Sequence, residues 1–201
     1  MLAKKLCEIA KGNRCKKVIL KSFQSQILKE DIGNSDFIIV DAYCWSPFHI
    51  ESINHYALEY NKPWIYIGGL ENDSVMIGPI FHGKESGCYK CLINRIKSNN
   101  EYSDIFTSYE KYLKDNRIAS KPDIIIHDSL IVDLIAALAF IEITKYLEGW
   151  AIPSTWRTLL KLNLQSMEMT KHNLLKVPYC EECKPQLEYN VSPWLEAITL
   201  K

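Results

Sequence analysis

Apolar and polar positions along this chain alternate in blocks that predict strands and helices in turn. The apolar run 36–41 is bounded by charged residues and predicts a buried parallel strand. Ser46 and Pro47 are typical of a helix start, and apolar residues then recur at helical spacing. Residues 64–67 predict the next strand. A strand, a helix and a strand within about thirty residues indicate a βαβ unit.

The pattern continues with a strand, further helices and a hairpin. Residues 74–81 predict a strand antiparallel to its predecessor, and residues 130–147 predict a long apolar helix that Gly149 ends. The remaining expected elements are a strand at 17–20, helices at 26–30 and 92–97, a polar helix within 99–121, and a hairpin of 158–164 and 168–172. The sequence therefore predicts an α/β fold.

Composition narrows the class of protein. With 201 residues, 47 % of them hydrophobic, the chain can form one globular domain. The 24 Lys and Arg residues balance the 24 Asp and Glu residues, so we expect no nucleic-acid partner, and we interpret the charged run 114–117 as solvated surface. Asp133 and Glu142 interrupt the most apolar stretch, so we expect no membrane span. The N-terminus resembles no signal peptide, which favours a reducing, cytoplasmic setting.

Four of the seven cysteines form two CxxC pairs, which are Cys88 with Cys91 and Cys180 with Cys183. Four thiolates are the usual ligands of a closed tetrahedral zinc site. Such a site leaves no position for water or substrate, so we favour structural zinc over its alternatives, which are two disulfides or independent redox motifs. The zinc module would comprise about residues 82–95 and 176–188 and would clamp the chain end to its middle.

For several other residues that could have a functional role, we favour a purely structural one. We expect Cys44 to be a buried, inert thiol rather than a nucleophile. His82 could replace a cysteine at the metal, but four cysteines already suffice. Three tyrosines could form a peptide-binding surface, but their spacing equally fits a packed helix face, which we favour: Tyr102, Tyr109 and Tyr112.

Three segments in combination carry a family resemblance: Gly-Cys-Tyr-Lys-Cys-Leu at 87–92, Glu-Ile-Thr-Lys-Tyr-Leu-Glu-Gly at 142–149, and Cys-Glu-Glu-Cys at 180–183. From about Val18 to Pro185, the chain resembles the E1/ThiF/MoeB superfamily of adenylating enzymes. The resemblance implies a truncated, Rossmann-related E1-like sheet with helices, plus the four-cysteine zinc module, in a single domain over residues 1–201.

The chain departs from the active enzymes where they bind ATP. Such enzymes open with a glycine-rich phosphate turn, but only Gly12 and Gly33 precede residue 68 here. Counting from Asp41, the family's magnesium-binding aspartate is replaced by Cys44, and the following asparagine by Trp45. An arginine expected in the next helix is also missing. Because ATP chemistry needs charge on the phosphates and a metal carboxylate, we expect this chain to bind no ATP.

A degenerate E1-like chain that keeps its cysteines is similar to the E1-like partner proteins (microcin B17 synthetase B-type) of YcaO cyclodehydratases in azole-peptide biosynthesis. The resemblance implies a non-catalytic scaffold or leader-handling subunit for a ribosomally made precursor peptide. Further expected partners are a flavin dehydrogenase and a separate leader-binding protein, since only about sixteen residues precede the first strand. A homodimer is a further option. The alternative is a minimal ThiF/MoeB-like enzyme that adenylates a carrier-protein C-terminus.

Overall fold

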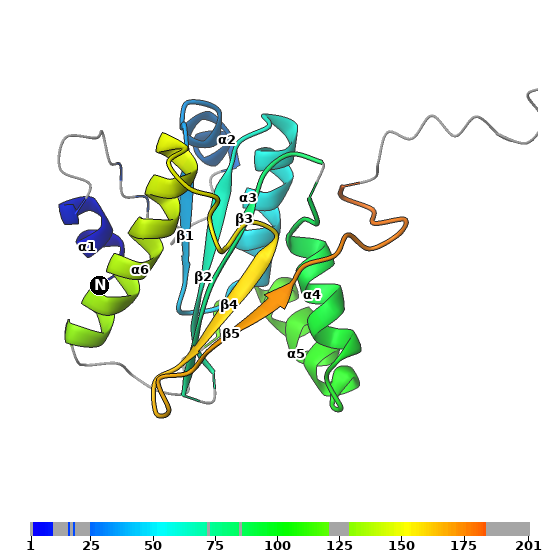
Figure 1. Ribbon diagram of the computed structural model, residues 1–201. Helices are drawn as coiled ribbons and strands as arrows, with labels where there is room; N and C mark the ends of the chain where they lie inside the picture. Colours follow the sequence, from blue (N-terminus) through cyan, green and yellow to red (C-terminus); the bar gives the residue numbers. More distant parts are fainter. Residues whose placement is uncertain are drawn as a thin grey trace, which may run out of the picture.

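A five-stranded mixed sheet forms the centre of the computed structural model, which describes residues 2–9, 16, 18, 25–71, 73–84, 86–120 and 129–183 (Figure 1). The strand order is β1-β2-β3-β4-β5; β1 and β2 are parallel and all other neighbours antiparallel. The strands are β1 (Ile38–Ala42), β2 (Trp64–Glu71), β3 (Ser74–Phe81), β4 (Thr158–Asn163) and β5 (Met169–Asn173). The predicted α/β class is confirmed.

Helices cover both faces of this sheet (Figure 1). The helices are α1 (Leu2–Ile9), α2 (Ser25–Gly33), α3 (Pro47–Glu59), α4 (Tyr89–Ser98), α5 (Ser103–Asn116) and α6 (Ser129–Glu148). α1 and α6 pack on one face, and α2, α3 and α4 on the other. α5 packs outside α3 and α4.

The central strand β2 shows why the strand segments are almost continuously apolar. Trp64 and Tyr66 point to the core beneath α3 and α4, while Ile65 and Ile67 point to the core beneath α6. Successive side chains of a strand lie on opposite faces of the sheet. When helices cover both faces, both sets of side chains are buried and are therefore mostly apolar.

Several element predictions are confirmed. β1, α3 and β2 form the βαβ unit, with Ile38 paired to Trp64. α3 begins at Pro47 as predicted, although the Ser46 hydroxyl lies 2.7 Å from His49 Nδ1 and makes no capping bond to the backbone. The hairpin and the long apolar helix appear as β4-β5 and α6.

Other predictions are modified. α4 begins three residues earlier than expected, because Cys88 occupies its N-cap position. α1 was not predicted at all. Of the strand expected at 17–20, the structure describes only Val18, which lies in no strand.

α6 carries a buried carboxylate that ties it to the segment entering β4. Glu142 accepts hydrogen bonds from the Thr155 backbone N–H at 2.8 Å and from the Thr155 hydroxyl at 3.0 Å. Lys145 lies 2.5 Å from the second carboxylate oxygen. The charge is therefore fully partnered despite its burial. Among the described helices, α6 included, none has the length and apolar character needed to cross a bilayer.

We expect Glu142→Ala to destabilise the fold by about 2–4 kcal/mol, because it leaves the buried Thr155 N–H without an acceptor. Urea-induced unfolding measures this loss. The matched control is Glu148→Ala at the exposed end of the same helix, which should change stability by less than about 0.5 kcal/mol. Equal losses in the two variants would contradict the role assigned to Glu142.

Candidate metal centre

The two cysteine pairs, 92 residues apart in sequence, meet at one end of α4. Cys88 immediately precedes α4 and Cys91 lies in its first turn, while Cys180 and Cys183 lie in the segment after β5. All four sulfurs lie within 4.8 Å of one another, and all four residues are buried.

The sulfur spacing matches a tetrahedral metal centre. Cys88 Sγ lies 3.9 Å from Cys91 Sγ and 3.7 Å from Cys180 Sγ, and Cys91 Sγ lies 3.6 Å from Cys183 Sγ. Four sulfurs bound tetrahedrally at about 2.3 Å are separated by about 3.8 Å, whereas a disulfide needs about 2.05 Å. The four thiols are free, and together they can hold one metal ion.

Close backbone packing brings the second pair onto the first. A Cβ on Gly87 would lie only 3.0 Å from Leu174 Cγ, so a larger residue at this position would require the Leu174 side chain to shift. The Val177 N–H donates to Cys91 Sγ at 3.4 Å, as outer-shell groups do at metal-bound thiolates. Arg95 Nε donates to the Leu175 carbonyl at 2.9 Å.

The surroundings of Cys91 favour its thiolate. Hydrogen bonds from the Cys183 and Cys88 thiols, together with the Val177 N–H, hold the pKa of Cys91 well below its usual range even though burial opposes this. A thiolate is the form that binds metal, and hydrogen bonds with Cys183 and Cys91 raise the pKa of Cys88. A metal ion must therefore displace the proton of Cys88 when it binds.

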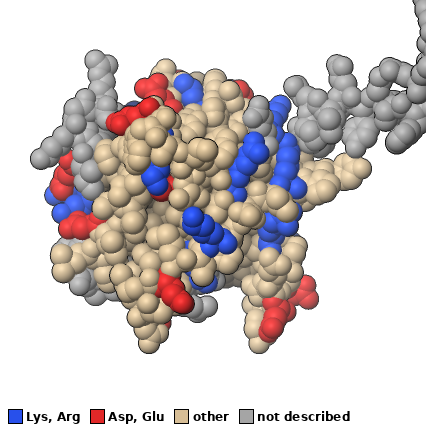
Figure 2. Space-filling view, in the orientation of Figure 1, with Lys and Arg blue, Asp and Glu red and all other residues tan. Residues whose placement is uncertain are grey.

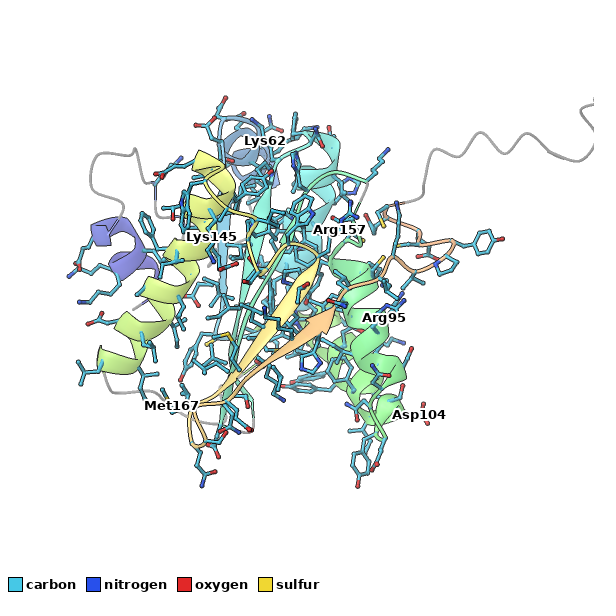
Figure 3. The ribbon with its side chains drawn as sticks, in the orientation of Figure 1. Lys62, Arg95, Asp104, Lys145, Arg157 and Met167 are labelled. Carbon is cyan, nitrogen blue, oxygen red and sulfur yellow. The ribbon has the colours of Figure 1, made fainter. Side chains whose placement is uncertain are left out.

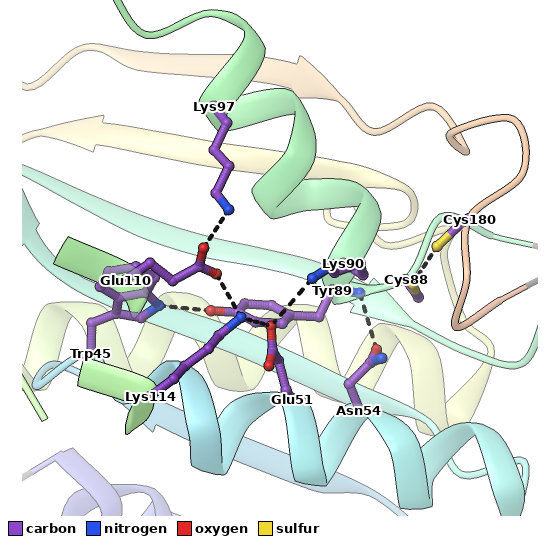
Figure 4. Close-up of polar contacts among 10 residues, drawn as sticks. All are labelled: Trp45, Glu51, Asn54, Cys88, Tyr89, Lys90, Lys97, Glu110, Lys114 and Cys180. Atoms are coloured by element: carbon purple, nitrogen blue, oxygen red, sulfur yellow. Dashed lines mark hydrogen bonds and ion pairs between the residues drawn. The ribbon is translucent and has the colours of Figure 1, made fainter. Parts of the chain in front are cut away.

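Tyr89, between the first two cysteines, connects the cluster to the rest of the site (Figure 4). Its N–H donates to Asn54 Oδ1 on α3 at 3.0 Å, and its hydroxyl accepts from Trp45 Nε1 at 2.7 Å. The side chain is fully buried, and burial raises the pKa of Tyr89, so the phenol stays protonated. One residue thus links α4, α3 and the end of β1.

A lysine–glutamate cluster lies beside Tyr89 and fixes α5 (Figure 4). Buried Glu110 pairs with Lys97 of α4 and lies 3.1 Å from Lys114. Lys114 also contacts Glu51 of α3, which lies 3.7 Å from Lys90. The interpretation of Lys114 as solvated surface is therefore wrong, because its ammonium group joins two carboxylates from different helices.

Trp45 packs firmly at the carboxyl end of β1. Its ring stacks on Phe106 at 5.2 Å between centroids and lies 6.4 Å from Tyr109. Its backbone N–H donates to the Ser120 hydroxyl at 3.0 Å, and its carbonyl accepts from the Ser120 N–H at 2.7 Å. The indole therefore sits under α5 and the segment that follows α5.

The ThiF family matches residues 1–183, almost the whole of this chain. The chain belongs to the ThiF family. The predicted superfamily resemblance is confirmed at this level. No significant match was found among curated proteins.

Solved structures share the fold of this ThiF-family chain. E. coli MccB has a TM-score of 0.58 at 20 % identity, and the aligned region comprises 85 % of this chain and 45 % of MccB. A heterocyclase in complex with substrate and cofactor has a TM-score of 0.60 at 17 % identity, with 91 % of this chain covering 26 % of that protein. The chain spans less than half of either structure, and at these identities the likeness is one of fold.

Cys44 in this ThiF-family chain is exposed, so the expectation of a buried thiol is wrong. The residue lies in the bend between β1 and α3, and the inward position of that bend belongs to Trp45. His49 contacts Ser46, and His55 Nδ1 lies 3.5 Å from Glu182 beside the second cysteine pair.

The expected packing of the α5 tyrosines is also wrong. Tyr102, Tyr109 and Tyr112 are 67 %, 44 % and 55 % exposed. The inward face of α5 is the neighbouring stripe, which comprises Phe106, Glu110 and Leu113. His82 lies away from the cysteines, with Nδ1 2.6 Å from the Tyr146 hydroxyl.

Sequence reasoning missed Asn54 and Glu110, and each carried a signal. Asn54 falls one turn after Ile50 within the apolar face of the predicted helix, and a lone amide at such a position indicates a buried hydrogen bond. Glu110 lies four residues before Lys114, which is a favourable helical ion-pair spacing.

Glu110→Gln should destabilise the fold by about 2 kcal/mol at pH 7, because it leaves two lysines without their buried partner. Burial opposes ionisation of Glu110, yet hydrogen bonds from Lys97 and Lys114 hold its pKa below the ordinary 4.5. Its contribution is therefore complete above pH 4.5 and is lost as pH falls through the folded-state pKa. Urea unfolding of both proteins across this range should show their difference shrinking at acid pH.

The matched control is Glu59→Gln, which removes an exposed pair with Lys29 and should cost at most about 1 kcal/mol. If the difference between Glu110→Gln and the parent protein did not depend on pH, the ionised carboxylate would have no part in fixing α5.

Proposed function

We propose that this chain is a non-catalytic E1-like subunit of an azole-forming synthetase, where it handles a ribosomally made precursor peptide. In this proposal a separate YcaO-type cyclodehydratase performs the ATP-dependent ring formation. The chain contributes a folded platform rather than a reacting group.

The packing of Trp45 carries this proposal. Ligands of α/β folds bind beyond the carboxyl ends of parallel strands, and Trp45 follows β1 at that edge. Its ring lies against Phe106, and both of its backbone groups bond to Ser120. A side chain held in this way favours a structural use of this end over a nucleotide site.

Two further observations support the proposal. The sequence offers no glycine-rich turn before residue 68 to approach phosphates, and position 44 carries a thiol in place of a metal-binding carboxylate. The proteins with a similar fold include MccB solved with MccA and a heterocyclase solved with a substrate and a cofactor, which supports the peptide-handling part of the proposal. MccB was also solved with ATP, so the non-catalytic part rests on the residues of this chain.

The same proposal gives the cysteine cluster a structural role. We infer that Cys88, Cys91, Cys180 and Cys183 bind one Zn2+, because four buried sulfurs at tetrahedral spacing fill all of its coordination positions. Zinc would supply no chemistry to a substrate here. It would hold the segment after β5 on α4.

We expect the purified protein to contain one zinc ion per chain by elemental analysis. Cys180→Ala should lose that ion and several kcal/mol of stability, because metal-binding energy in such sites is folding energy. Cys44→Ala changes an exposed cysteine outside the cluster and should keep both the metal and the stability. A Cys180→Ala protein that folds and assembles normally without zinc would contradict the structural role, and stoichiometric iron would contradict the choice of metal.

Reconstitution tests the function. The chain is combined with the YcaO-type protein and the precursor peptide that we expect to be encoded beside its gene, and mass spectrometry follows the loss of one water per ring. We expect rings only when all three components and ATP are present, and neither ATP binding nor AMP formation by this chain alone. Ring formation that proceeds equally well without this chain would sink the proposal. Conversion of ATP to AMP and pyrophosphate by this chain with a Gly-Gly-ending carrier protein would establish the adenylating alternative.

A further inference from the structure

β5 is an open edge of the sheet. β4 pairs with it on one side, and within the described residues no strand pairs with it on the other. All five of its residues are exposed. An edge strand of this kind presents backbone donors and acceptors to any extended chain that comes alongside.

The register of the hairpin shows which residues present those groups. The Leu174 N–H donates to the Arg157 carbonyl, and the Asn163 N–H donates to the Glu168 carbonyl. Bonded pairs alternate along an antiparallel ladder, so the even-numbered residues of β5 bond to β4. The backbone groups of Met169, Lys171 and Asn173 therefore point outward.

Several cations near this edge form no ion pair, and the exposed Glu168 lies directly before β5. Six basic residues lie on β4, on β5 or on the segments beside them: Lys84, Arg95, Arg157, Lys161, Lys171 and Lys176. None of the six forms an ion pair within the described part of the chain.

Two figures show this arrangement. Basic side chains gather over the β4–β5 region and α4, with acidic ones toward the margins (Figure 2). Arg157 and Arg95 lie near the end of β5 opposite the Met167 turn (Figure 3).

Two of these side chains are held in place by main-chain carbonyls. Arg95 donates to the Leu175 carbonyl and Lys176 to the Lys84 carbonyl. Their positive charge is thus positioned next to the strand before a ligand arrives, which lowers the entropy cost of binding.

We propose that the outer edge of β5 binds an extended, acidic peptide segment, which joins the sheet as an additional strand. The main-chain groups of the edge supply affinity, and the surrounding cations select for carboxylate side chains. The inference rests on the proposed function in that a precursor peptide is the natural source of such a segment.

The edge charges argue against a second copy of this chain as the occupant. Two β5 strands paired antiparallel about a twofold axis at Lys171 would place the two lysines directly opposite each other, which is unfavourable. An acidic strand has the complementary charge.

The test uses the full chain and a fluorescein-labelled peptide of about ten residues in which threonine and glutamate alternate. Fluorescence anisotropy measures its affinity beside that of a threonine–lysine peptide of equal length. We expect the acidic peptide to bind about tenfold or more tightly, with an affinity that falls as salt is added.

Lys171→Pro removes an outward N–H without removing a ladder bond to β4, so it tests the strand pairing itself. Lys171→Glu tests the charge and keeps the backbone donor. Each should weaken acidic-peptide binding by about tenfold, while Lys111→Glu, an exposed change on α5, should leave it unaltered. If Lys171→Pro fails to fold, Lys171→Glu still decides.

Four results would overturn the proposal: undiminished binding by Lys171→Glu, tighter binding of a single-stranded oligonucleotide than of the acidic peptide, a dimer that Lys171→Pro dissolves, or peptide binding only after removal of residues 184–201. The last would assign the edge to the chain's own C-terminal segment.

The experiments distinguish a failure of the proposed peptide-binding edge from a failure of the proposed function. Ring formation that needs this chain without any peptide binding at β5 would remove only the edge, and peptide binding at β5 without support of ring formation would remove only the function.

Discussion

The meeting of the chain end with the start of α4 is the constraint on which the second half of this fold depends. Cys88 and Cys180 are 92 residues apart, yet their sulfurs lie 3.7 Å from each other. β4 and β5 extend from β3 toward the edge of the sheet, and the segment beyond β5 returns to α4 through the Leu174–Gly87 contact and the Val177–Cys91 hydrogen bond. A cross-link that closes so long a loop removes much conformational freedom from the unfolded chain. Metal binding here would therefore stabilise the position of the segment after β5 on α4.

Tyr89 extends this constraint to the opposite end of the site. The residue lies between two cysteines, and its hydrogen bonds reach Asn54 on α3 and Trp45 after β1. The carboxyl end of β1 is thus joined to the cysteine cluster through one fully buried side chain. The polar groups of this region hydrogen-bond to one another.

The sequence predicted correctly those features that depend on local periodicity or on the spacing of residues. The βαβ unit, the hairpin, α6 and the cysteine cluster all follow from local patterns. The wrong predictions concern which face of a helix is buried and whether a side chain points into the protein or toward solvent. α5 carries two adjacent stripes, one with Phe106 and Leu113 and one with Tyr109 and Tyr112. A period of 3.6 residues does not determine which stripe faces α3. The exposure of Cys44 and the burial of Glu110 likewise depend on partners such as Trp45 and Lys97, which are distant in sequence.

The zero net charge gives no hint of the charge separation on the surface. Lysines on an edge strand often serve only to prevent aggregation, and Lys171 alone fits that explanation. The other cations fit it less well. Lys84, Arg95 and Arg157 belong to three separate segments outside β5, and Arg95 and Lys176 are fixed by main-chain carbonyls. A single charge on an edge strand is enough to repel a second copy of that strand. Cations contributed by several segments, as around β5, can in addition favour a partner of opposite charge.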